Sequence, residues 1–535
     1  MKKRNFKAGL LGLLGLFTII GLQSCLKYPD LKPTNDVTSE TVYSSPAGYK
    51  QVLAKVYGAF ALTGNQGPAG NGDVQGIDEG FSDFYRLFWK AQELSTDEAV
   101  ISWGDVGIQD FHNMNWSSNN SFLTGLYYRC LYQITLCNDF IRESSDESLS
   151  KRAISGTDAD NIREYAREAR FLRAFQYWVL MDLYGNPPFA TETSAIGGAP
   201  PPQASRTQVF NYIESELKAI EPNMPAAKSN EYGRADKGAV WALLARLYLN
   251  AQVYTGTARY SDAMTYSKKV IDAGYTLLNN YRWLMLADNN VNNPEFIFSI
   301  NYDGLKTTGY GGTTFLTHAS VGGTMPSTAS GVGGGWSGIR TTKNLVNLFP
   351  DVNGTADKRA QFYTSDQSVE ISNLTDFKNG YAITKFRNVK RDGSLGQSQD
   401  FADIDMPLFR LAEMYLIYAE SAVRTNTDLT TALGYINKLR GRAYANDPSS
   451  TTGNITSQSD MTLDFILEER ARELYWEGFR RTDLVRYNKF VEASYLWPWK
   501  GGIASGTSVD QYRKIYPIPS RDINANTNLS QNTGY

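Results

Sequence analysis

The sequence predicts a mainly α protein, in which a tetratricopeptide-like helical scaffold carries long ordered loops and a few short strands. Apolar residues recur with the helical period of about 3.6 residues through much of 42–278 and again in 406–488. The neighbouring segments 235–254 and 259–273 have complementary faces, as paired helices do. Between 279 and 405 the helical period nearly disappears, and Gly, Ser, Thr and Asn dominate. A loop-rich region inserted into a helical scaffold is therefore expected.

The first 24 residues have the layout of a secretory signal. A basic start is followed by an apolar run, Ala8–Leu22, that is too short to span a bilayer comfortably. Cys25 directly follows Leu22-Gln23-Ser24, a pattern typical of the cleavage box of bacterial lipoproteins. We predict a signal peptide over 1–24 and a lipid on the Cys25 thiol, since several acyl chains anchor a protein where one does not. The alternative is an ordinary secretory signal with an incidental cysteine.

The segment after Cys25 is polar, has no period and contains Pro29 and Pro33, so we predict a lipidated tether over 25–41. The formal net charge is −2, and no long run of one charge sign follows the signal. This balance argues against nucleic acid as a partner, because such binding needs a basic surface. No later apolar segment approaches about 18 residues, so the N-terminal lipid is the only expected contact with the membrane.

The first predicted helix begins at Pro46 and continues through an apolar stripe that includes Tyr49, Leu53 and Val56. A glycine-rich loop follows at 64–80. Later helical patterns cover 122–142, 159–184, 206–221, 235–254, 259–273, 406–424, 429–443 and 460–488. Small residues on 235–254 let the aromatic face of 259–273 approach closely, which is typical of tetratricopeptide units. No clean repeat of about 34 residues occurs, however.

Cys130 and Cys137 lie on the apolar stripe of the predicted helix 122–142. Seven helical residues rise about 10 Å, which is beyond the reach of a disulfide. We therefore predict two buried free thiols that pack as small hydrophobes. An exported chain without disulfides must be held by its core alone, and the length of this chain permits such a core.

The region 279–405 is too long to be structureless inside a compact domain unless it has a function. Its stretch Gly331–Gly338 is close to low complexity. Because binding residues concentrate on ordered loops, we expect the ligand site here. The predicted single domain, 42–535, then consists of the helical scaffold, this loop-rich region and a C-terminal segment, 489–535.

Motifs of the common enzyme classes are missing or weak. The chain has two histidines, His112 and His318, and no His-Glu-x-x-His, Gly-x-Ser-x-Gly or Walker A motif. The Gly-x-Gly-x-x-Gly match that begins at Gly333 lacks a βαβ context. A glycosidase is the remaining enzyme alternative, and it needs two carboxylates about 5 Å or 6.5–9.5 Å apart across a cleft. The clustered candidates are Asp78, Glu79, Glu93, Asp97 and Glu98.

A metal site has one weak candidate. The segment 288–293 is rich in Asp and Asn oxygens, which hard cations such as Ca²⁺ prefer, but its spacing matches no EF-hand loop. A structural calcium is one alternative, and an exposed polar turn is the other. No cofactor is required by any motif.

Five sets of sequence blocks carry a family resemblance. They are Ala169-Arg170-Phe171-Leu172-Arg173-Ala174; Arg234-Ala235-Asp236-Lys237; Pro407-Leu408-Phe409-Arg410; Glu468-Glu469-Arg470 with Asp483-Leu484-Val485-Arg486; and Tyr516-Pro517-Ile518-Pro519 with the closing Asn532-Thr533-Gly534-Tyr535. Together they span nearly the whole chain and resemble the SusD/RagB family of outer-membrane lipoproteins. The resemblance implies a tetratricopeptide-like scaffold, no catalysis and a lid-like partnership with a SusC-like TonB-dependent transporter.

Further segments, at 78–103, 303–312, 335–337 and 496–509, resemble the starch-binding members of this family. Carried over residue by residue, the resemblance implies a glycan site in which three rings form an aromatic arc and two side chains make polar contacts. The arc is Trp103, Tyr310 and Trp336, and the polar contacts are Asp78 and Arg86. The expected ligand is starch or a maltooligosaccharide, and the alternative is a different glycan in the same role.

Two differences from the starch-binding members bear on the choice of glycan. Those members have an asparagine three residues after the first tryptophan of the arc, where this chain has Val106. Valine cannot donate a hydrogen bond, so the neighbouring Asp105 becomes a weaker candidate for the site. The chain is also shorter between Phe349 and Asn373.

The residues of the candidate site suit the chemistry of sugars. An aromatic ring covers the apolar face of a sugar ring, while Arg and Asp hold its hydroxyl groups. Tyr310 and Trp336 stand in glycine-rich loops, where a core role is hard to satisfy. Trp103 could instead belong to the core, and Asp78 and Arg86 could pair with each other or cap a helix. A shallow site of this kind is expected to bind in the micromolar to millimolar range.

Overall fold

The structure, a computed structural model, describes residues 39–535. The predicted signal peptide, the predicted lipidation site Cys25 and the predicted tether up to residue 38 lie outside the described residues. The end of the tether belongs to a short helix, α2 (Ser39–Val42), so the prediction of chain without a helix up to Thr41 is wrong there. No helix in the described part is both long and apolar enough to cross a membrane.

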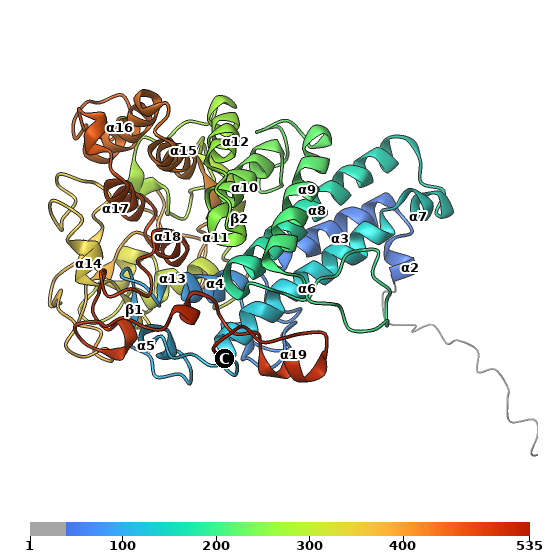
Figure 1. Ribbon diagram of the computed structural model, residues 1–535, viewed down its shortest axis with the longest axis horizontal. Coiled ribbons are helices and arrows are strands. Elements are labelled where there is room, and N and C mark those ends of the chain that lie inside the picture. Colours follow the sequence, from blue (N-terminus) through green and yellow to red (C-terminus); the bar gives the residue numbers. More distant parts are fainter. Residues whose placement is uncertain (1–38) are drawn as a thin grey trace, which may run out of the picture.

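Long helices packed side by side build the N-terminal half (Figure 1). The longest, α8 (Gly156–Tyr184), contacts α3 (Pro46–Gly58), α6 (Ser121–Glu143) and α9 (Arg206–Ile220). Polar side chains cap the N-termini of some of these helices. The Ser205 hydroxyl accepts a hydrogen bond from Gln208 N at the start of α9 while the Gln208 side chain caps Ser205 N, which forms a capping box.

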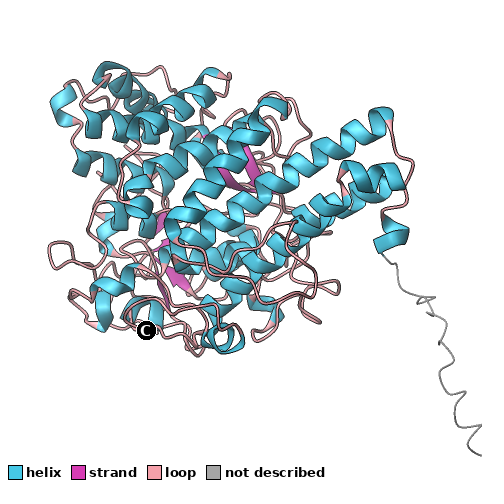
Figure 2. Cartoon of the chain, turned by 45° about the vertical axis from the view of Figure 1, so that its right-hand side comes forward, coloured by secondary structure: helices cyan, strands magenta, loops and turns pink. Residues whose placement is uncertain are grey.

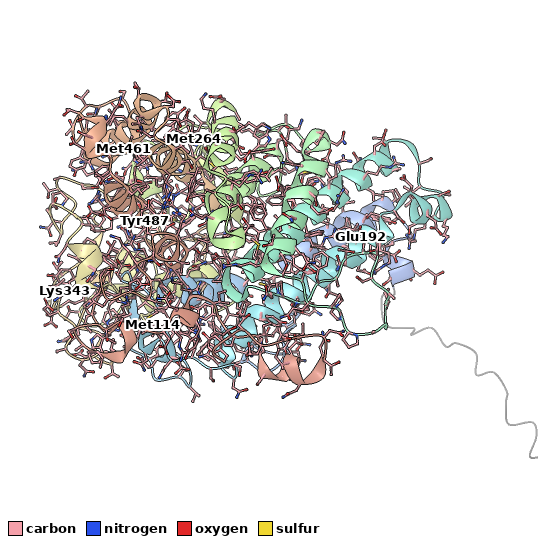
Figure 3. All side chains as sticks on the ribbon, in the orientation of Figure 1. Met114, Glu192, Met264, Lys343, Met461 and Tyr487 are labelled. Carbon is pink, nitrogen blue, oxygen red and sulfur yellow. The ribbon has the colours of Figure 1, made fainter. Side chains whose placement is uncertain are left out.

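A second row of helices continues the scaffold. Helix α12 (Tyr260–Asp272) packs between α10 (Lys237–Leu249) and α15 (Leu411–Thr425), and α15 contacts α16 (Leu429–Ala445). The side chains fill the space between them: Met264 of α12 accepts a hydrogen bond from the Thr425 hydroxyl at the end of α15, with a distance of 3.9 Å (Figure 3). The predicted pairing of two neighbouring helical segments is confirmed.

Three predicted helices are interrupted. Segment 235–254 is interrupted at Asn250, and a separate short helix, α11 (Ala251–Thr255), follows. The Asn250 side chain donates to Arg246 O, the carbonyl one turn earlier, and accepts from Arg486. The predicted helix 406–424 begins as a strand, β6 (Met406–Arg410), which contains a proline and pairs antiparallel with β2 (Phe296–Ile300).

The third interruption lies within 460–488. Helix α17 (Leu463–Leu474) ends before α18 (Arg480–Arg486), because Trp476 and Gly478 between them adopt positive φ angles of 64° and 84°. The Trp476 N–H donates to the Glu98 carboxylate over 3.1 Å, which holds this turn against a distant segment.

Several helices in the structure were not predicted, and two of them support the candidate site. They are α4 (Phe84–Glu93) and α13 (Gly312–Ala319). Every residue of each is buried. In α4 the polar residues Arg86, Lys90 and Glu93 recur at helical spacing, a signal in the sequence that was missed, whereas α13 has only eight residues and begins with a glycine. The remaining short α-helices are α5 (Asp110–Asn113), α7 (Asp146–Lys151), α14 (Lys343–Val346) and α19 (Ser520–Ala525).

The strands are few and short, as predicted, and stand out against the helices and loops in Figure 2. Three antiparallel pairs occur in the described part: β2 with β6, and two pairs of two-residue strands. The latter are β1 (Val100–Ile101) with β3 (Ile339–Arg340) and β4 (Phe362–Tyr363) with β5 (Ala382–Ile383). The pair β1–β3 joins the segment before Trp103 to the segment after Trp336.

A buried network of ion pairs ties the loop-rich region to the scaffold. Arg410 Nη1 lies 2.8 Å from Glu295 and 2.6 Å from Glu473 of α17, and Arg442 of α16 lies 3.0 Å from Glu295. Arg359, from the loop-rich region, contacts Glu473 over 3.3 Å. Burial by itself would raise the pKa of Glu473, but these three arginines lower it to about 2.

Cys130 and Cys137 are both buried free thiols, which confirms the prediction. Both lie on α6 and pack in the main core. Burial raises the pKa of the Cys137 thiol to about 12, so this thiol is protonated and unreactive at neutral pH.

Candidate functional site

The structure brings the predicted site residues together around one open pocket of about 400 Å³. Three segments that are far apart in the sequence form it, namely 78–86, 103–105 and 310–336. The lining consists of Asp78, Gly80, Phe81, Arg86, Trp103, Asp105, Tyr310 and Trp336. All five predicted residues and the weaker candidate Asp105 therefore face a common space.

Asp83 positions the two helices beneath this pocket. Its Oδ1 accepts hydrogen bonds from Arg86 N in the first turn of α4 (2.8 Å) and from Gly312 N at the start of α13 (2.7 Å). A side chain at position 311 would place its Cβ 1.9 Å from the Cβ of Asp83, so this approach requires glycine. Burial raises the pKa of Asp83 to about 6, while the two backbone N–H groups favour its charged form.

Arg86 forms the floor of the pocket. Its Nη1 donates to Gly80 O (2.8 Å) and to Tyr310 O (2.7 Å), which fastens two sides of the pocket to one buried group. The guanidinium carbon lies 4.6 Å from the centre of the Phe81 ring and 4.7 Å from that of Phe315. Burial lowers the pKa of Arg86 to about 9, so the group is still charged at neutral pH.

Asp78 lies on the exposed edge of the pocket. Its Oδ1 accepts from Gly80 N (2.9 Å) and caps the short 3₁₀ helix η1 (Glu79–Phe81). No ion pair joins Asp78 to Arg86 within the described residues, so of the two structural alternatives the cap is the one that occurs. The carboxylate still lines the pocket.

Trp103 is partly core and partly pocket wall. Its indole N–H donates to Trp336 O over 3.0 Å, and its ring packs edge-to-face on Phe315, with 6.0 Å between centroids. Gly338 lies against the indole, where a Cβ would come within 2.6 Å of Trp103 Cζ2. The Trp103 and Trp336 rings are 6.4 Å apart and inclined by 45°.

The loop that carries Trp336 is held in place by the end of α13. Trp336 N donates to His318 O (2.8 Å), and Gly338 N donates to Ala319 O (2.8 Å). The His318 ring stacks on the Trp336 ring, with 4.7 Å between centroids and 24° between planes. A stretch that reads as low complexity in the sequence is thus an ordered support for one aromatic ring.

Tyr310 completes the wall. Its ring lies 6.2 Å from that of Trp336, with an angle of 66° between planes, and its side chain is 37% exposed. The three rings therefore present a curved apolar surface to solvent, with Arg86 below them. Three contributors to the site were missed in the sequence: Phe81, Phe315 and His318. Phe81 follows the glycine-rich loop directly, a visible signal, whereas the other two lie on the unpredicted helix α13.

Val106 does not line the pocket. Its side chain is 92% exposed, on a turn that is closed by a hydrogen bond from Ile108 N to Asp105 O (3.0 Å). Asp105 does line the pocket, in agreement with its place as the weaker candidate.

The carboxylates that could have served a glycosidase are mostly used by the fold. Asp97 receives both Nε and Nη2 of Arg480 at 2.7 Å, and Glu93 accepts from Gly478 N at 2.7 Å. Glu98 binds the N–H of Trp476, and Glu79 accepts from the Thr63 hydroxyl at 3.0 Å. None of these four carboxylates lines the pocket.

The oxygen-rich turn at 288–293 is likewise internally bonded. The Asn289 amide donates to Leu284 O and Asp405 O, and Asp288 accepts from Arg391 N. Within residues 39–535 no three His, Cys, Asp or Glu side chains are grouped so as to hold a metal ion. These contacts support the polar-turn alternative over calcium.

Comparison with known proteins shows the family to which the chain belongs. A profile described as "Starch-binding associating with outer membrane" matches residues 78–249, and a profile of the SusD family matches residues 361–535. Starch-binding protein SusD of Bacteroides thetaiotaomicron is 35% identical, in an alignment that covers 100% of this chain and 99% of that protein. The chain belongs to the SusD family.

Other SusD-family proteins are more distant. SusD-like protein P2 of Formosa agariphila is 26% identical over 73% of this chain and 78% of its own length. A SusD homologue of Bacteroides thetaiotaomicron has a TM-score of 0.73 at 19% identity and covers 93% of this chain and 99% of its own. A SusD-like carbohydrate-binding protein of Bacteroides fragilis has a TM-score of 0.70 at 20% identity, with 92% and 100% covered. These two structures show the shared SusD fold, and family membership supports a glycan-binding role.

Proposed function

We propose that this SusD-family protein captures starch and maltooligosaccharides in the pocket of Trp103, Tyr310 and Trp336 and does not cleave them. The observation that carries the proposal is the curved wall of three rings above a buried arginine. Neighbouring rings are inclined by 45° and 66°, so a bound chain must curve to follow them. An α-1,4-glucan is naturally helical and meets this requirement. The 35% identity to a protein named for starch binding supports the same ligand.

Each group has a defined task in this proposal. The rings cover the apolar C–H faces of successive glucose units, and stacking of this kind contributes about 0.5–1.5 kcal/mol per pair beyond buried area. Asp78 and Asp105 at the edge accept hydrogen bonds from sugar hydroxyls. Arg86 holds both sides of the pocket through Gly80 O and Tyr310 O, so the rings are positioned before the ligand arrives.

Binding without hydrolysis is supported by how the carboxylates are used. Glu79, Glu93, Asp97 and Glu98 are bonded within the fold and do not line the pocket, and Asp78, which does, caps η1. A glycosidase needs one carboxyl group on each side of the scissile bond, so Asp78 and Asp105, the two carboxylates of the pocket lining, are the pair that a test of hydrolysis must address. Prolonged incubation of the pure protein with amylose should leave the chain-length distribution unchanged. Short maltooligosaccharides that vanish on mutation of Asp78 or Asp105 would instead indicate a hydrolase.

The ligand proposal is tested by titration calorimetry with maltoheptaose. Trp336→Ala should weaken binding several-fold or more, because it removes the central ring of the wall. Trp283→Ala is the matched control, since Trp283 is also a partly exposed tryptophan but lies outside the pocket. Unchanged affinity in a folded Trp336→Ala protein would exclude this site. Binding of chitin oligomers or inulin in preference to maltoheptaose would keep the site and change the glycan.

We also propose that a lipid on Cys25 anchors the protein to the outer membrane, where it delivers the glycan to a SusC-like TonB-dependent transporter. Family membership and the sequence of the first 25 residues support this role. Cys25→Ala should move the protein from the membrane to the soluble fraction. Purification of the tagged protein in mild detergent should recover the transporter with it, and recovery as a free monomer would count against a stable complex.

A further inference from the structure

A second hollow, of about 290 Å³, lies beside α3 and is here called the Tyr232 hollow. Apolar side chains of α3 and the residues after it form one side, and the loop 231–234 forms another. Asn301 and Thr307 close it. Tyr232 also lines a neighbouring cavity of about 270 Å³. The proposed function uses none of these residues.

The ring of Tyr232 is exposed but fixed. Its side chain is 49% exposed, yet its hydroxyl donates to Asp405 Oδ2 over 2.7 Å. The other oxygen of Asp405 accepts from Tyr302 N over 2.8 Å, so the phenol is fastened to the core. An exposed ring whose orientation is already set loses little entropy when a ligand stacks on it.

Polar groups surround this ring at positions that suit sugar hydroxyls. Lys50 Nζ and Glu231 Oε1 form an exposed pair 3.0 Å apart at the edge of the hollow. Asn301 lies at the surface, and its Oδ1 accepts from the Ser299 hydroxyl over 2.8 Å. Its amide packs directly on Gly233, where φ is 80° and a Cβ would lie 2.0 Å from Nδ2. Only glycine allows the amide to lie this close to the backbone beside Tyr232.

The Tyr232 hollow and the candidate pocket share two bordering segments. Thr307 lines the hollow and Tyr310 lines the pocket, so their Cα atoms are at most about 11 Å apart along the chain. Likewise, the segment from Leu62 in the hollow leads to Asp78 in the pocket. The segments 62–78 and 307–310 contact each other at Gly67 and Thr308. A Cβ added at Gly67 would lie only 2.7 Å from Thr308 O. The contact of Gly67 with Thr308 is here called the ridge between the two sites.

We propose that the Tyr232 hollow is a second subsite for the same glycan chain that occupies the aromatic pocket. This inference rests on the proposed function. A chain long enough to cross the ridge contacts the Tyr232 ring as well as the three-ring wall, whereas a short oligomer fills the pocket alone. Because the second contact is intramolecular, it raises affinity for long chains without requiring strong binding of its own.

The test compares short and long ligands. Maltotriose and amylose of defined length are titrated against the wild type, Tyr232→Ala and Tyr232→Phe. Tyr232→Ala should weaken amylose binding several-fold and leave maltotriose binding unchanged. Tyr232→Phe keeps the ring but loses the hydrogen bond that fixes it, so it should keep most of the wild-type amylose affinity and bind clearly better than Tyr232→Ala. A second variant, Leu62→Lys, places a charge on the wall of the hollow at a side chain that is 37% exposed, and it should reproduce the amylose defect.

The outcomes separate the two proposals. Wild-type amylose affinity in Tyr232→Ala and in Leu62→Lys would overturn the second subsite while the pocket stands. An equal loss in Tyr232→Phe and Tyr232→Ala would also overturn it, because the loss would trace to the hydrogen bond with Asp405 and not to the ring. If Trp336→Ala leaves both ligands unaffected, the proposed function itself fails.

Discussion

Arg86 shows how one residue can serve the fold and the candidate site together. It is buried, it carries a charge, and one nitrogen serves two carbonyls from segments more than 200 residues apart, at Gly80 and Tyr310. Its flat guanidinium also packs between the rings of Phe81 and Phe315. Removing this side chain takes the donor from the buried Gly80 carbonyl and from the partly buried Tyr310 carbonyl, and it leaves the walls of the pocket without a common support.

Arg86→Met is therefore expected to lower both stability and affinity. Hydrogen bonds from a charged donor are typically worth about 1.5–3 kcal/mol, so the free energy of unfolding should fall by that order. Maltoheptaose affinity should fall in the same variant, because Gly80 and Tyr310 are released. Denaturant unfolding and calorimetry measure the two effects. Wild-type affinity in the destabilised variant would show that Arg86 supports the fold without positioning the rings.

At the scale of elements, the loop 331–338 depends on glycine at one position and not at another. A Cβ at 338 would lie 2.6 Å from Trp103, whereas a Cβ at 334 would have no atom within 4 Å, and neither glycine has a positive φ. Gly338→Ala should thus displace the Trp103 ring and weaken maltoheptaose binding several-fold. Gly334→Ala is the control in the same loop and should bind normally. Equal affinities in the two variants would remove Trp103 from the binding wall.

The junction between the scaffold and the loop-rich region depends on buried charge. Glu473 on α17 meets Arg359, Arg410 and Arg442, all fully buried. Glu473→Gln keeps the size and shape of the side chain but removes the negative charge that pairs with the three arginines. Breaking a buried ion pair in this way costs about 3–5 kcal/mol.

The expected result for Glu473→Gln is a large loss of stability, measured by chemical denaturation. Glu468→Gln, whose side chain is about half exposed on the same helix, should change stability by less than about 1 kcal/mol. A similar small change in Glu473→Gln would mean that packing, and not charge, joins the two regions.

For the whole molecule, buried carboxyl groups of two kinds set the dependence of stability on pH. Arg486 and other arginines lower the pKa of Glu420 to about 2 against the effect of burial, and Glu473 is similar. These groups stabilise the fold above their unfolded pKa of 4.5, and that stability is lost as the pH falls toward 2. Burial raises the pKa of Asp83 to about 6 and that of Asp405 to about 7, so these groups favour the fold when protonated.

The two kinds of group together predict a stability maximum at mildly acidic pH. As the pH decreases below about 4, the melting temperature should fall steeply. As the pH increases from about 4 to 7, it should fall more gently, because the unfolded chain releases protons that Asp83 and Asp405 retain in the fold. Calorimetric scans across this range measure both limbs. Asp405→Asn should flatten the upper limb, and a melting temperature that rises steadily from pH 4 to 7 would contradict the assignment.

Much of the helical scaffold is predictable from local pattern. The stripe through Cys130 and Cys137 predicts α6, and Pro46 marks the start of α3, because an amphipathic helix records in its own residues which face is buried. Helix α4 carries the same kind of record in Arg86, Lys90 and Glu93, which was missed, whereas α13 is too short for its pattern to stand out. The segment that contains Pro407 forms strand β6 where a helix was predicted. The prediction was wrong there because the partner strand, β2, lies more than 100 residues away in the sequence.

The candidate site divides in the same way. Sequence alone establishes the family resemblance, the aromatic residues of the loops and the free thiols, because each is written in a short stretch of chain. The family resemblance predicts that Asp78, Arg86, Trp103 and Trp336 form one site, but the contacts that bring them together, and the place of Tyr232 beside them, come from tertiary structure. Hydrogen bonds between distant segments produce them, such as those from Arg86 to Tyr310 O and from Tyr232 to Asp405. Local periodicity carries no information about partners at that separation.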